Sequence, residues 1–265
     1  MTAIAITIAG SDSGGGAGIQ ADLKTFSALG VYGASVLTAI TAQNTLGVSA
    51  VEDVSVSMIE AQIEAVLSDL SVKAIKIGML SREDTIKTVA DGLQAYAGPV
   101  VLDPVMVATS GDRLLRDDAV MALKAVLMPR VDLITPNLFE AAILTGLPVA
   151  QTHENVVRQA EQLRSDGARA VLIKGGHGGG SECVDVFLTD RGEFQEFRYP
   201  RLETTNDHGT GCTLSAAIAA RLALGENLLD AVTAAKHYLH AALSAGRSLA
   251  IGKGRGPVHH FFGQW

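Results

Sequence analysis

The sequence contains few of the residues that mark several common classes of protein. Its two cysteines, Cys183 and Cys212, are too few for a disulfide framework or a zinc site of several cysteines, and we expect a reducing cytoplasm. Aromatic residues make up only 5% of the chain, so its core is expected to be aliphatic. The net charge is −7 and no basic stripe appears, so we expect no nucleic-acid partner.

The beginning of the sequence lacks the pattern of a targeting or membrane segment. Residues 2–9 form a short apolar run with no basic region before it, and Asp12 follows closely. The run is too short to span a membrane, and its β-branched residues favour a buried strand. We therefore expect no membrane partner.

Short apolar runs alternate along the chain with segments of helical spacing, which predicts an α/β fold. The expected strands are residues 2–9, 35–42, 73–78, 99–103, 131–135 and 170–174. The expected helices are residues 19–29, 57–70, 81–96, 117–127, 136–145, 155–166, 212–224 and 227–244. This order predicts a mostly parallel central sheet with helices on both faces.

The remaining segments complete this prediction. Residues 184–188 and 194–199 alternate in hydrophobicity, which predicts a hairpin at one edge of the sheet. The tail, residues 252–265, is expected to wrap over the surface. Because no repeat or linker interrupts the pattern, we expect one domain over residues 1–265.

The loop after the first expected strand is rich in glycine. Residues 14, 15, 16 and 18 are all glycine, which is more than a tight turn needs and favours close approach of a ligand. The spacing is not G-x-G-x-x-G, because Ile19 stands where the last glycine belongs, and no Gly-Lys-Ser/Thr follows. The loop therefore indicates neither a nicotinamide dehydrogenase nor a Walker A nucleotide site.

A second glycine-containing segment, residues 204–217, leads through Gly209 and Gly211 into an Ala-rich helical pattern. The unpaired N–H groups and the positive end of such a helix predict an anion site. Cys212 stands at the mouth of this site, where the pKa of a thiol is expected to fall. Cys212 and His208 are candidate bases; the alternatives are a buried cysteine and a histidine that orders the loop.

Charged and amide side chains follow several of the expected strands. Asp103 ends one strand, and Asn137 and Glu140 begin a helix; their oxygens suit Mg²⁺, although each could equally cap a helix or turn. Lys174 could reach polyphosphate oxygens or be a solvated lysine at a strand end. From periodicity alone, Lys236 is an exposed helix lysine. Together with the anion site, these charged and amide side chains favour a site that binds a nucleotide with Mg²⁺.

Pairs of histidines are a further candidate for metal binding. His237 and His240 share a helix face, and His259 and His260 are adjacent. Two ligands without a nearby third do not make a zinc site. We therefore do not predict a histidine metal centre.

Many motifs in a fixed order give the sequence a family resemblance over nearly its whole length. They are residues 9–25, 41–45, 76–80, 103–111, 135–142, 174–177, 208–217 and 256–260. With these motifs the sequence resembles the bacterial hydroxymethylpyrimidine/phosphomethylpyrimidine kinases of thiamine biosynthesis, a branch of the ribokinase-like superfamily. The resemblance implies a ribokinase-like three-layer sandwich, use of ATP and Mg²⁺, and a homodimer. It also implies phosphorylation of 4-amino-5-hydroxymethyl-2-methylpyrimidine and then of its monophosphate.

The resemblance also implies roles for single residues. Gln43 would hydrogen-bond the aminopyrimidine, and Gly10, Asp22, Met79 and Val107 would line the same pocket. The implied residues of the ATP region are Asn137, Asp103, Lys174 and Lys236, those of the metal site are Glu140 and Asp103, and those of the catalytic anion hole are Gly209, Thr210, Gly211 and Cys212.

One position departs from the wider superfamily. Ribokinase-like sugar kinases usually have an aspartate base where Cys212 stands. Phosphoryl transfer depends mainly on positioning and charge stabilisation, so Cys212 as the base is a hypothesis. A pyridoxal kinase of the same branch and a non-catalytic nucleotide- or metabolite-binding module are the alternative functions.

Overall fold

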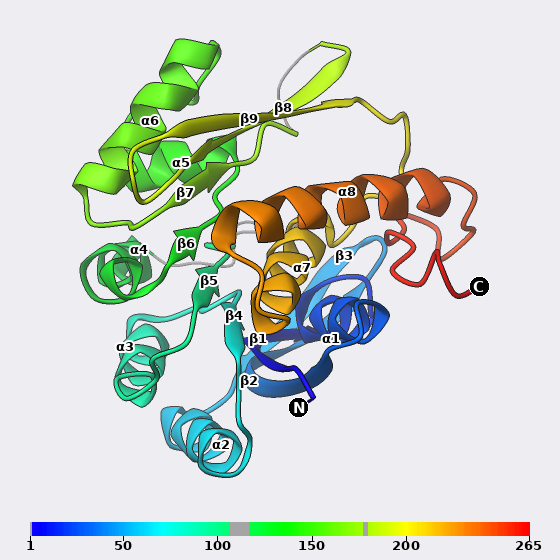
Figure 1. Cartoon of the computed structure of the whole chain (residues 1–265). Coiled ribbons are helices and arrows are strands. Elements are labelled where there is room, and N and C mark those ends of the chain that lie inside the picture. Colours follow the sequence, from blue (N-terminus) through cyan, green and yellow to red (C-terminus); the bar gives the residue numbers. More distant parts are fainter. Residues whose placement is uncertain (1, 107–116, 177–179) are drawn as a thin grey trace.

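The computed structural model describes residues 2–106, 117–176 and 180–265. Within these residues one sheet of nine strands runs through the molecule in the order β3-β2-β1-β4-β5-β6-β7-β8-β9 (Figure 1). The strands are β1 (Ile4–Asp12), β2 (Tyr32–Asn44), β3 (Gly47–Asp53), β4 (Ala74–Ile77), β5 (Val100–Leu102), β6 (Leu133–Ile134), β7 (Val171–Ile173), β8 (Glu182–Leu188) and β9 (Phe194–Pro200).

The direction of the strands confirms the prediction of a mostly parallel sheet. Strands β1, β2, β4, β5, β6 and β7 pair in parallel. Antiparallel strands close both edges, β3 beside β2 at one edge and the β8–β9 hairpin beside β7 at the other. The carboxyl ends of the parallel strands therefore point to one rim, where ligands bind in such sheets.

Helices cover both faces of the sheet and make three layers (Figure 1). One face carries α2 (Val56–Asp69), α3 (Glu83–Gly92), α4 (Asp117–Ala122), α5 (Leu138–Thr145) and α6 (His153–Ser165). The other face carries α1 (Gly18–Ala28), α7 (Thr210–Ala223) and α8 (Leu228–Gly246). Each face of the sheet therefore has its own hydrophobic core.

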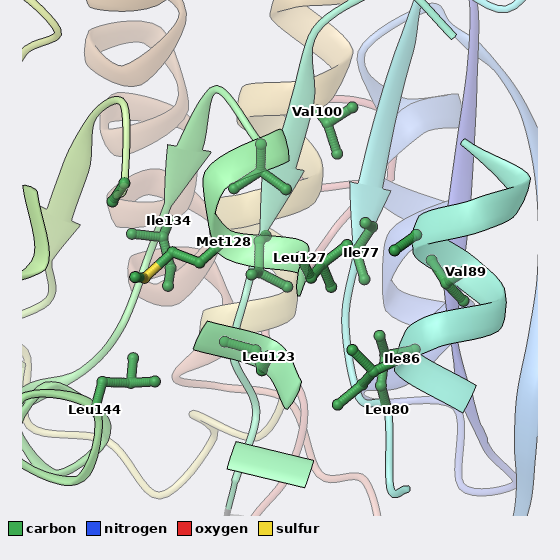
Figure 2. Close-up of a cluster of buried hydrophobic side chains, with 14 of the residues drawn as sticks. Ile77, Leu80, Ile86, Val89, Val100, Leu123, Leu127, Met128, Ile134 and Leu144 are labelled. Carbon is green, nitrogen blue, oxygen red and sulfur yellow. The ribbon is translucent and has the colours of Figure 1, made fainter. Parts of the chain in front are cut away.

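The first core is aliphatic, as the low aromatic content predicts. Figure 2 shows its central part, where side chains of β4, β5 and β6 meet those of α3 and of the turns that follow α4. Ile77, Leu102 and Ile134 come from three neighbouring strands and are completely buried. Strands buried on both faces need continuous apolar runs, which is the pattern found in the sequence.

The second core is organised around the alanine-rich helix α7. Ala216, Ala217, Ala219 and Ala220 are completely buried. Their small side chains let α7 pack against β1, β4 and β5 on one side and against α1 and α8 on the other. This packing fixes the N-terminus of α7 at the ligand-binding rim.

Several elements differ from the sequence prediction. Strand β3 was not expected; its Ser, Glu and Asp residues and its exposure give it no apolar run. The helix expected over residues 81–96 ends at Gly92, and the one expected over residues 117–127 changes to a π-helical turn at Leu123–Leu127 and a 3₁₀ turn at Met128–Arg130. The described residues contain no helix long and apolar enough to cross a membrane.

The tail differs most, because residues 256–260 are buried and do not wrap over the surface. Val258 is only 2% exposed. The Tyr238 hydroxyl donates to the carbonyl of His260 at 2.7 Å, and the Thr213 hydroxyl lies 3.1 Å from His260 Nε2. The tail therefore belongs to the packing of α7 and α8.

Candidate active site

Loops from the ends of several strands and the N-terminus of α7 meet at one place on the rim. Asp103 follows β5 and Lys174 follows β7. A Cβ built on Gly211, in the first turn of α7, would lie 3.2 Å from Lys174 Nζ and 3.4 Å from Asp103 Oδ2. The structure thus brings together residues that the sequence separates by more than a hundred positions.

The start of α7 has the geometry of an anion site. Gly209 is the N-cap with φ of 79°, a left-handed conformation that favours glycine. The N–H of Thr210 donates to the carbonyl of Asp207 at 3.2 Å. As a glycine, the N-cap has no side chain that could accept from the N–H groups that follow, which favours an anion there. A Cβ on Gly209 would overlap the carbonyl oxygen of Gly16, so the two glycine segments are in backbone contact.

Asp12 organises the glycine-rich loop after β1. Its carboxylate accepts the backbone N–H groups of Gly14 at 2.8 Å, Gly16 at 3.0 Å and Ala17 at 2.8 Å. Burial would raise the pKa of Asp12, but the His208 side chain and these N–H groups outweigh it, and the pKa is lowered. Asp12 is therefore ionised and ties the loop to His208.

The residues implied at the pyrimidine pocket fall into three groups. Gly10 and Met79 are neighbours, since a Cβ on Gly10 would lie 2.5 Å from Met79 Cε. Gln43, at the end of β2, has its side-chain Nε2 at 3.2 Å from His208 Nε2. Val107 lies outside the described residues. Gln43, Gly10 and Met79 thus lie around the end of β1, and their contact with a substrate stays a prediction.

Asp22 is buried beneath this region. It is fully inaccessible, and its Oδ2 binds Lys76 Nζ at 2.7 Å and the Thr7 hydroxyl at 2.6 Å. Burial would lower the pKa of Lys76, but the charge of Asp22 reverses this and holds Lys76 protonated. In this structure Asp22 faces Lys76 and no open surface, so its place in the pocket stays a prediction.

The predicted fall in the pKa of Cys212 is wrong. Burial raises the pKa of its thiol to about 11, and the carboxylates of Asp22 and Asp103 add to this, while Lys76 acts in the opposite direction. Desolvation and the two carboxylates penalise the thiolate more than Lys76 and the backbone N–H of Gly18 stabilise it. Cys212 is therefore a neutral thiol at physiological pH.

Asp103, Lys174 and Glu140 form a charged cluster. Lys174 Nζ lies 2.7 Å from Asp103 Oδ1 and 3.9 Å from Glu140 Oε2. Burial would lower the pKa of Lys174, but Asp103 and Glu140 raise it. The Ser215 hydroxyl, on α7, donates to Asp103 Oδ2 at 3.2 Å and links the cluster to the anion site.

Asn137 and Glu140 also form the capping box that the sequence left open as an alternative. Glu140 Oε2 accepts the N–H of Asn137 at 2.8 Å, and Asn137 Oδ1 accepts the N–H of Glu140 at 2.9 Å. Burial raises the pKa of Glu140 to about 7, although Lys174 acts to lower it. Glu140 therefore caps α5 and faces the cluster at once.

The cluster suits Mg²⁺ that arrives with a nucleotide more than a metal held by protein alone. Among the described residues no group of three or more His, Cys, Asp or Glu side chains could hold a metal ion. Mg²⁺ usually keeps several waters and binds through one or two carboxylates plus phosphates. Asp103 and Glu140 provide that number of carboxylates.

The histidine pairs have other contacts. The rings of His237 and His240 lie 5.8 Å and 4.9 Å from the ring of Tyr199. The ring of His259 lies 4.5 Å from that of Trp265. These side chains pack against aromatic rings.

Lys236 corrects the expectation of an exposed helix lysine. It is 8% exposed, and its Nζ binds Asp185 Oδ2 at 2.5 Å. Asp185 Oδ1 also accepts the N–H of Gly175 at 2.9 Å, next to Lys174 in the chain. Lys236 thus supports the loop that carries Lys174, and its proximity to a nucleotide stays a prediction.

Sequence reasoning missed Lys76, Asp185 and Ser215 as parts of the site. Lys76 stands inside the otherwise apolar strand β4, and a charge in such a strand signals a buried partner. Asp185 stands similarly within β8. Ser215 gave no signal, because serine is common in helices that carry small residues.

Comparison with known proteins agrees with this geometry. The sequence profile of the family described as "Phosphomethylpyrimidine kinase" matches residues 12–259. The chain belongs to this family. It is 63% identical over its whole length to the hydroxymethylpyrimidine/phosphomethylpyrimidine kinase of Rhizobium meliloti (strain 1021), of which 99% is covered.

Two solved structures confirm the fold. The phosphomethylpyrimidine kinase of Clostridium difficile 630 is 44% identical with a TM-score of 0.80, over 90% of this chain and 98% of that one. The pyridoxal kinase of Bacillus subtilis in its ADP complex is 36% identical with a TM-score of 0.90, over 98% of each chain. The chain is thus a kinase of the ribokinase-like fold.

Proposed function

We propose that the chain phosphorylates 4-amino-5-hydroxymethyl-2-methylpyrimidine with ATP, and then its monophosphate to the diphosphate. The observation that carries this proposal is the position of the α7 N-terminus. It faces Lys174 and Asp103 on one side, and its N-cap Gly209 touches the loop after β1 on the other. A phosphoryl group at Gly211 would therefore lie between a nucleotide region and a pocket beside Gln43.

In the reaction the hydroxymethyl oxygen forms a bond to the γ-phosphorus, and the bond from that phosphorus to the bridging oxygen of ADP breaks. Charge spreads over the transferring oxygens, and catalysis of this step is mainly positioning and electrostatic stabilisation. The N–H groups at the start of α7 and the Lys174 ammonium supply that stabilisation. The hydroxyl proton passes to water as the oxygen–phosphorus bond forms.

Cys212 does not take this proton in the mechanism we propose. A thiol whose pKa is raised to about 11 remains protonated at pH 7. Its sulfur also accepts a hydrogen bond from the Gly18 backbone, which places it against the loop after β1. Cys212 therefore shapes the pocket, and the N–H groups at the start of α7 stabilise the negative charge of the phosphoryl group.

We propose that Mg²⁺ binds together with ATP. Asp103 and Glu140 would hold it, directly or through water, and it would neutralise part of the phosphate charge. We propose that Lys174 then turns from the carboxylates towards the phosphates.

We also propose that two copies of the chain form a homodimer in the cytoplasm, each copy acting as one kinase domain over residues 1–265. Several side chains of β2, of β3, of the turn between them and of the start of α2 are apolar and exposed, which supports this. They are Ile40, Leu46, Val51, Val56 and Met58. Sedimentation of the wild type and of Val51→Glu tests the dimer, which the charge should weaken.

Pyridoxal is the alternative substrate, because the B. subtilis enzyme of similar structure is a pyridoxal kinase. An ATP-coupled assay with the pyrimidine alcohol, its monophosphate and pyridoxal in parallel tests the proposal. Turnover of both pyrimidines with higher kcat/KM than pyridoxal is expected. Turnover of pyridoxal alone would refute it, and no turnover of any would favour a binding module.

A further inference from the structure

His208 contacts one residue in the glycine-rich loop after β1 and one residue at the end of β2. Its Nε2 is 2.9 Å from Asp12 Oδ2 and 3.2 Å from Gln43 Nε2. His208 and Asp12 are both buried. The bonding of Gln43 matters, because the proposed function places its amide against the substrate.

The ring of His208 is fixed from two directions. A Cβ on Gly16 would lie 2.5 Å from His208 Cδ2, so the ring packs directly against the glycine loop. The backbone N–H of His208 donates to the carbonyl of Gly256 at 3.0 Å, so the buried tail holds the other side. His208 therefore has little freedom to change its contacts.

Counting protons around this group determines the tautomer of His208. Asp12 is ionised and can only accept, so the 2.9 Å contact requires a proton on His208 Nε2. That nitrogen is then a donor. Its other neighbour, Gln43, must turn an acceptor towards it.

The same count at Thr41 leads to the same orientation of Gln43. The single hydroxyl proton of Thr41 goes to the carbonyl of Ser11, which is 2.7 Å away and can only accept. In the structure the atom 3.2 Å from Thr41 Oγ1 is Gln43 Oε1, and Gln43 Nε2 faces His208. With the Thr41 proton committed to Ser11, the atom beside Thr41 Oγ1 should be a donor, which requires the amide to be turned over from that orientation. The two ends of the amide have nearly the same shape, so these partners decide its orientation.

We propose that His208, held by Asp12, is a positioning residue that selects the pyrimidine by fixing the orientation of the Gln43 amide. In this orientation, the reverse of the one in the structure, the amide oxygen shares the single Nε2–H of His208 with Asp12, and the amide nitrogen donates to Thr41 Oγ1. One N–H and one oxygen lone pair of Gln43 remain for the substrate. An aminopyrimidine edge, with a ring-nitrogen acceptor beside an amino donor, can use both. This inference rests on the proposed function of Gln43.

Nitrogen NMR of the imidazole rings in the full-length protein tests the tautomer without an activity measurement. The two ring nitrogens have separate signals that report which one carries the proton. Loss of one set of signals in His208→Phe assigns His208. A protonated Nε2 is expected, and an Nδ1-protonated neutral ring would overturn the inference.

Kinetics with two substrates tests the selective role. His208→Phe removes the donor and should lower kcat/KM for the pyrimidine alcohol by about 10- to 100-fold, mainly through KM. The kcat/KM for pyridoxal, which lacks the aminopyrimidine edge, should fall much less. The ratio of kcat/KM for the pyrimidine alcohol to kcat/KM for pyridoxal should therefore fall. The KM for ATP should not change. His208→Gln, which can still donate to Asp12 and Gln43, should restore most of the ratio.

Two controls separate this role from a merely structural one. His237→Phe, on an exposed part of α8, should leave the ratio unchanged. An equal fall for both substrates in His208→Phe, with the ratio preserved, would overturn the inference. If His208→Phe does not fold, two measurements still test the inference. They are the NMR spectrum of the wild type and the ratio of kcat/KM for the pyrimidine alcohol to kcat/KM for pyridoxal in His208→Gln. If the wild type phosphorylates no pyrimidine, the proposed function fails, whereas the NMR spectrum still tests the tautomer.

Discussion

Lys174 Nζ lies 2.7 Å from Asp103 Oδ1, although the two residues follow different strands of the sheet. The pair stands beside Gly211 at the start of α7. A positive charge at this position can follow the phosphoryl group as its charge develops. This relationship connects the loops after β5 and β7 with the anion site.

Replacing Lys174 by Met should therefore lower kcat by about 10²- to 10³-fold, the usual cost of losing one group that stabilises the transferring charge. The change keeps the aliphatic part of the side chain. Steady-state kinetics with saturating ATP and pyrimidine alcohol measures it. Lys87→Met, on the exposed surface of α3, is the matched control and should be unaffected. A kcat within threefold of wild type in Lys174→Met would remove Lys174 from the transition state.

Cys212→Ala should keep kcat within about tenfold of wild type, because a neutral thiol contributes shape and no proton transfer. Alkylation of Cys212 by iodoacetamide should be slow at pH 8 and accelerate as the pH approaches the raised pKa of about 11. Mass spectrometry of the labelled peptide follows it separately from Cys183. A loss of a thousandfold in kcat, or fast labelling at pH 7, would restore Cys212 as the base.

Gly209→Ala should abolish activity, since its Cβ would overlap the Gly16 carbonyl oxygen and the backbone is left-handed. Gly225→Ala is a matched control, because φ is also positive there but nothing lies within 4 Å of the added Cβ. It should cost about 1 kcal/mol of stability and leave kcat unchanged. Thermal unfolding and kinetics of both variants separate the effect of the close contact with Gly16 from the effect of the left-handed backbone conformation. Equal activity in the two variants would show that the close approach of Gly209 and Gly16 is unimportant.

The raised pKa of Glu140 should make the free energy of unfolding depend on pH in the absence of ligands. Burial raises its pKa from 4.5 to about 7, so between these values the folded state binds more protons than the unfolded state. The free energy of unfolding should therefore fall as the pH rises through this window, by an amount on the order of 3 kcal/mol.

Glu140→Gln should remove this decline, because glutamine can keep the capping box without a charge. Denaturant unfolding at pH 5 and pH 8 measures the difference. Glu64→Gln, at an exposed position of α2, is the control and should decline as the wild type does. A decline of the same size in Glu140→Gln would assign it to other groups.

The sequence predicted the fold because its patterns are local. The apolar runs of β5 and β7 and the alanine-rich run of α7 each specify a buried element without knowledge of the rest. Strand β3 lacks such a pattern, since it is held mainly by backbone pairing with β2. The buried tail could not be foreseen either, because its burial depends on α7 and α8.

The sequence predicted which loops would meet at the site, but not the buried partners Lys76, Asp185 and Ser215 or the electrostatics. The loops after parallel strands had to meet at one rim, so Asp103, Lys174 and Gly211 could be placed together. The pKa of Cys212 depends on desolvation and on Asp22, Asp103 and Lys76, whose arrangement is a product of the whole fold. Local reasoning from the helix N-terminus therefore gave the wrong sign.

The central claim is that one site at the start of α7 carries out two successive phosphoryl transfers to a pyrimidine. Phosphorus NMR of a reaction containing only the purified protein, ATP, Mg²⁺ and the pyrimidine alcohol tests it most directly. We expect a monophosphate signal to appear first and to be replaced by the paired signals of a diphosphate, and we expect Gly209→Ala to abolish both steps. Failure to form either product, or a Gly209→Ala variant that retains one of the two steps, would contradict it.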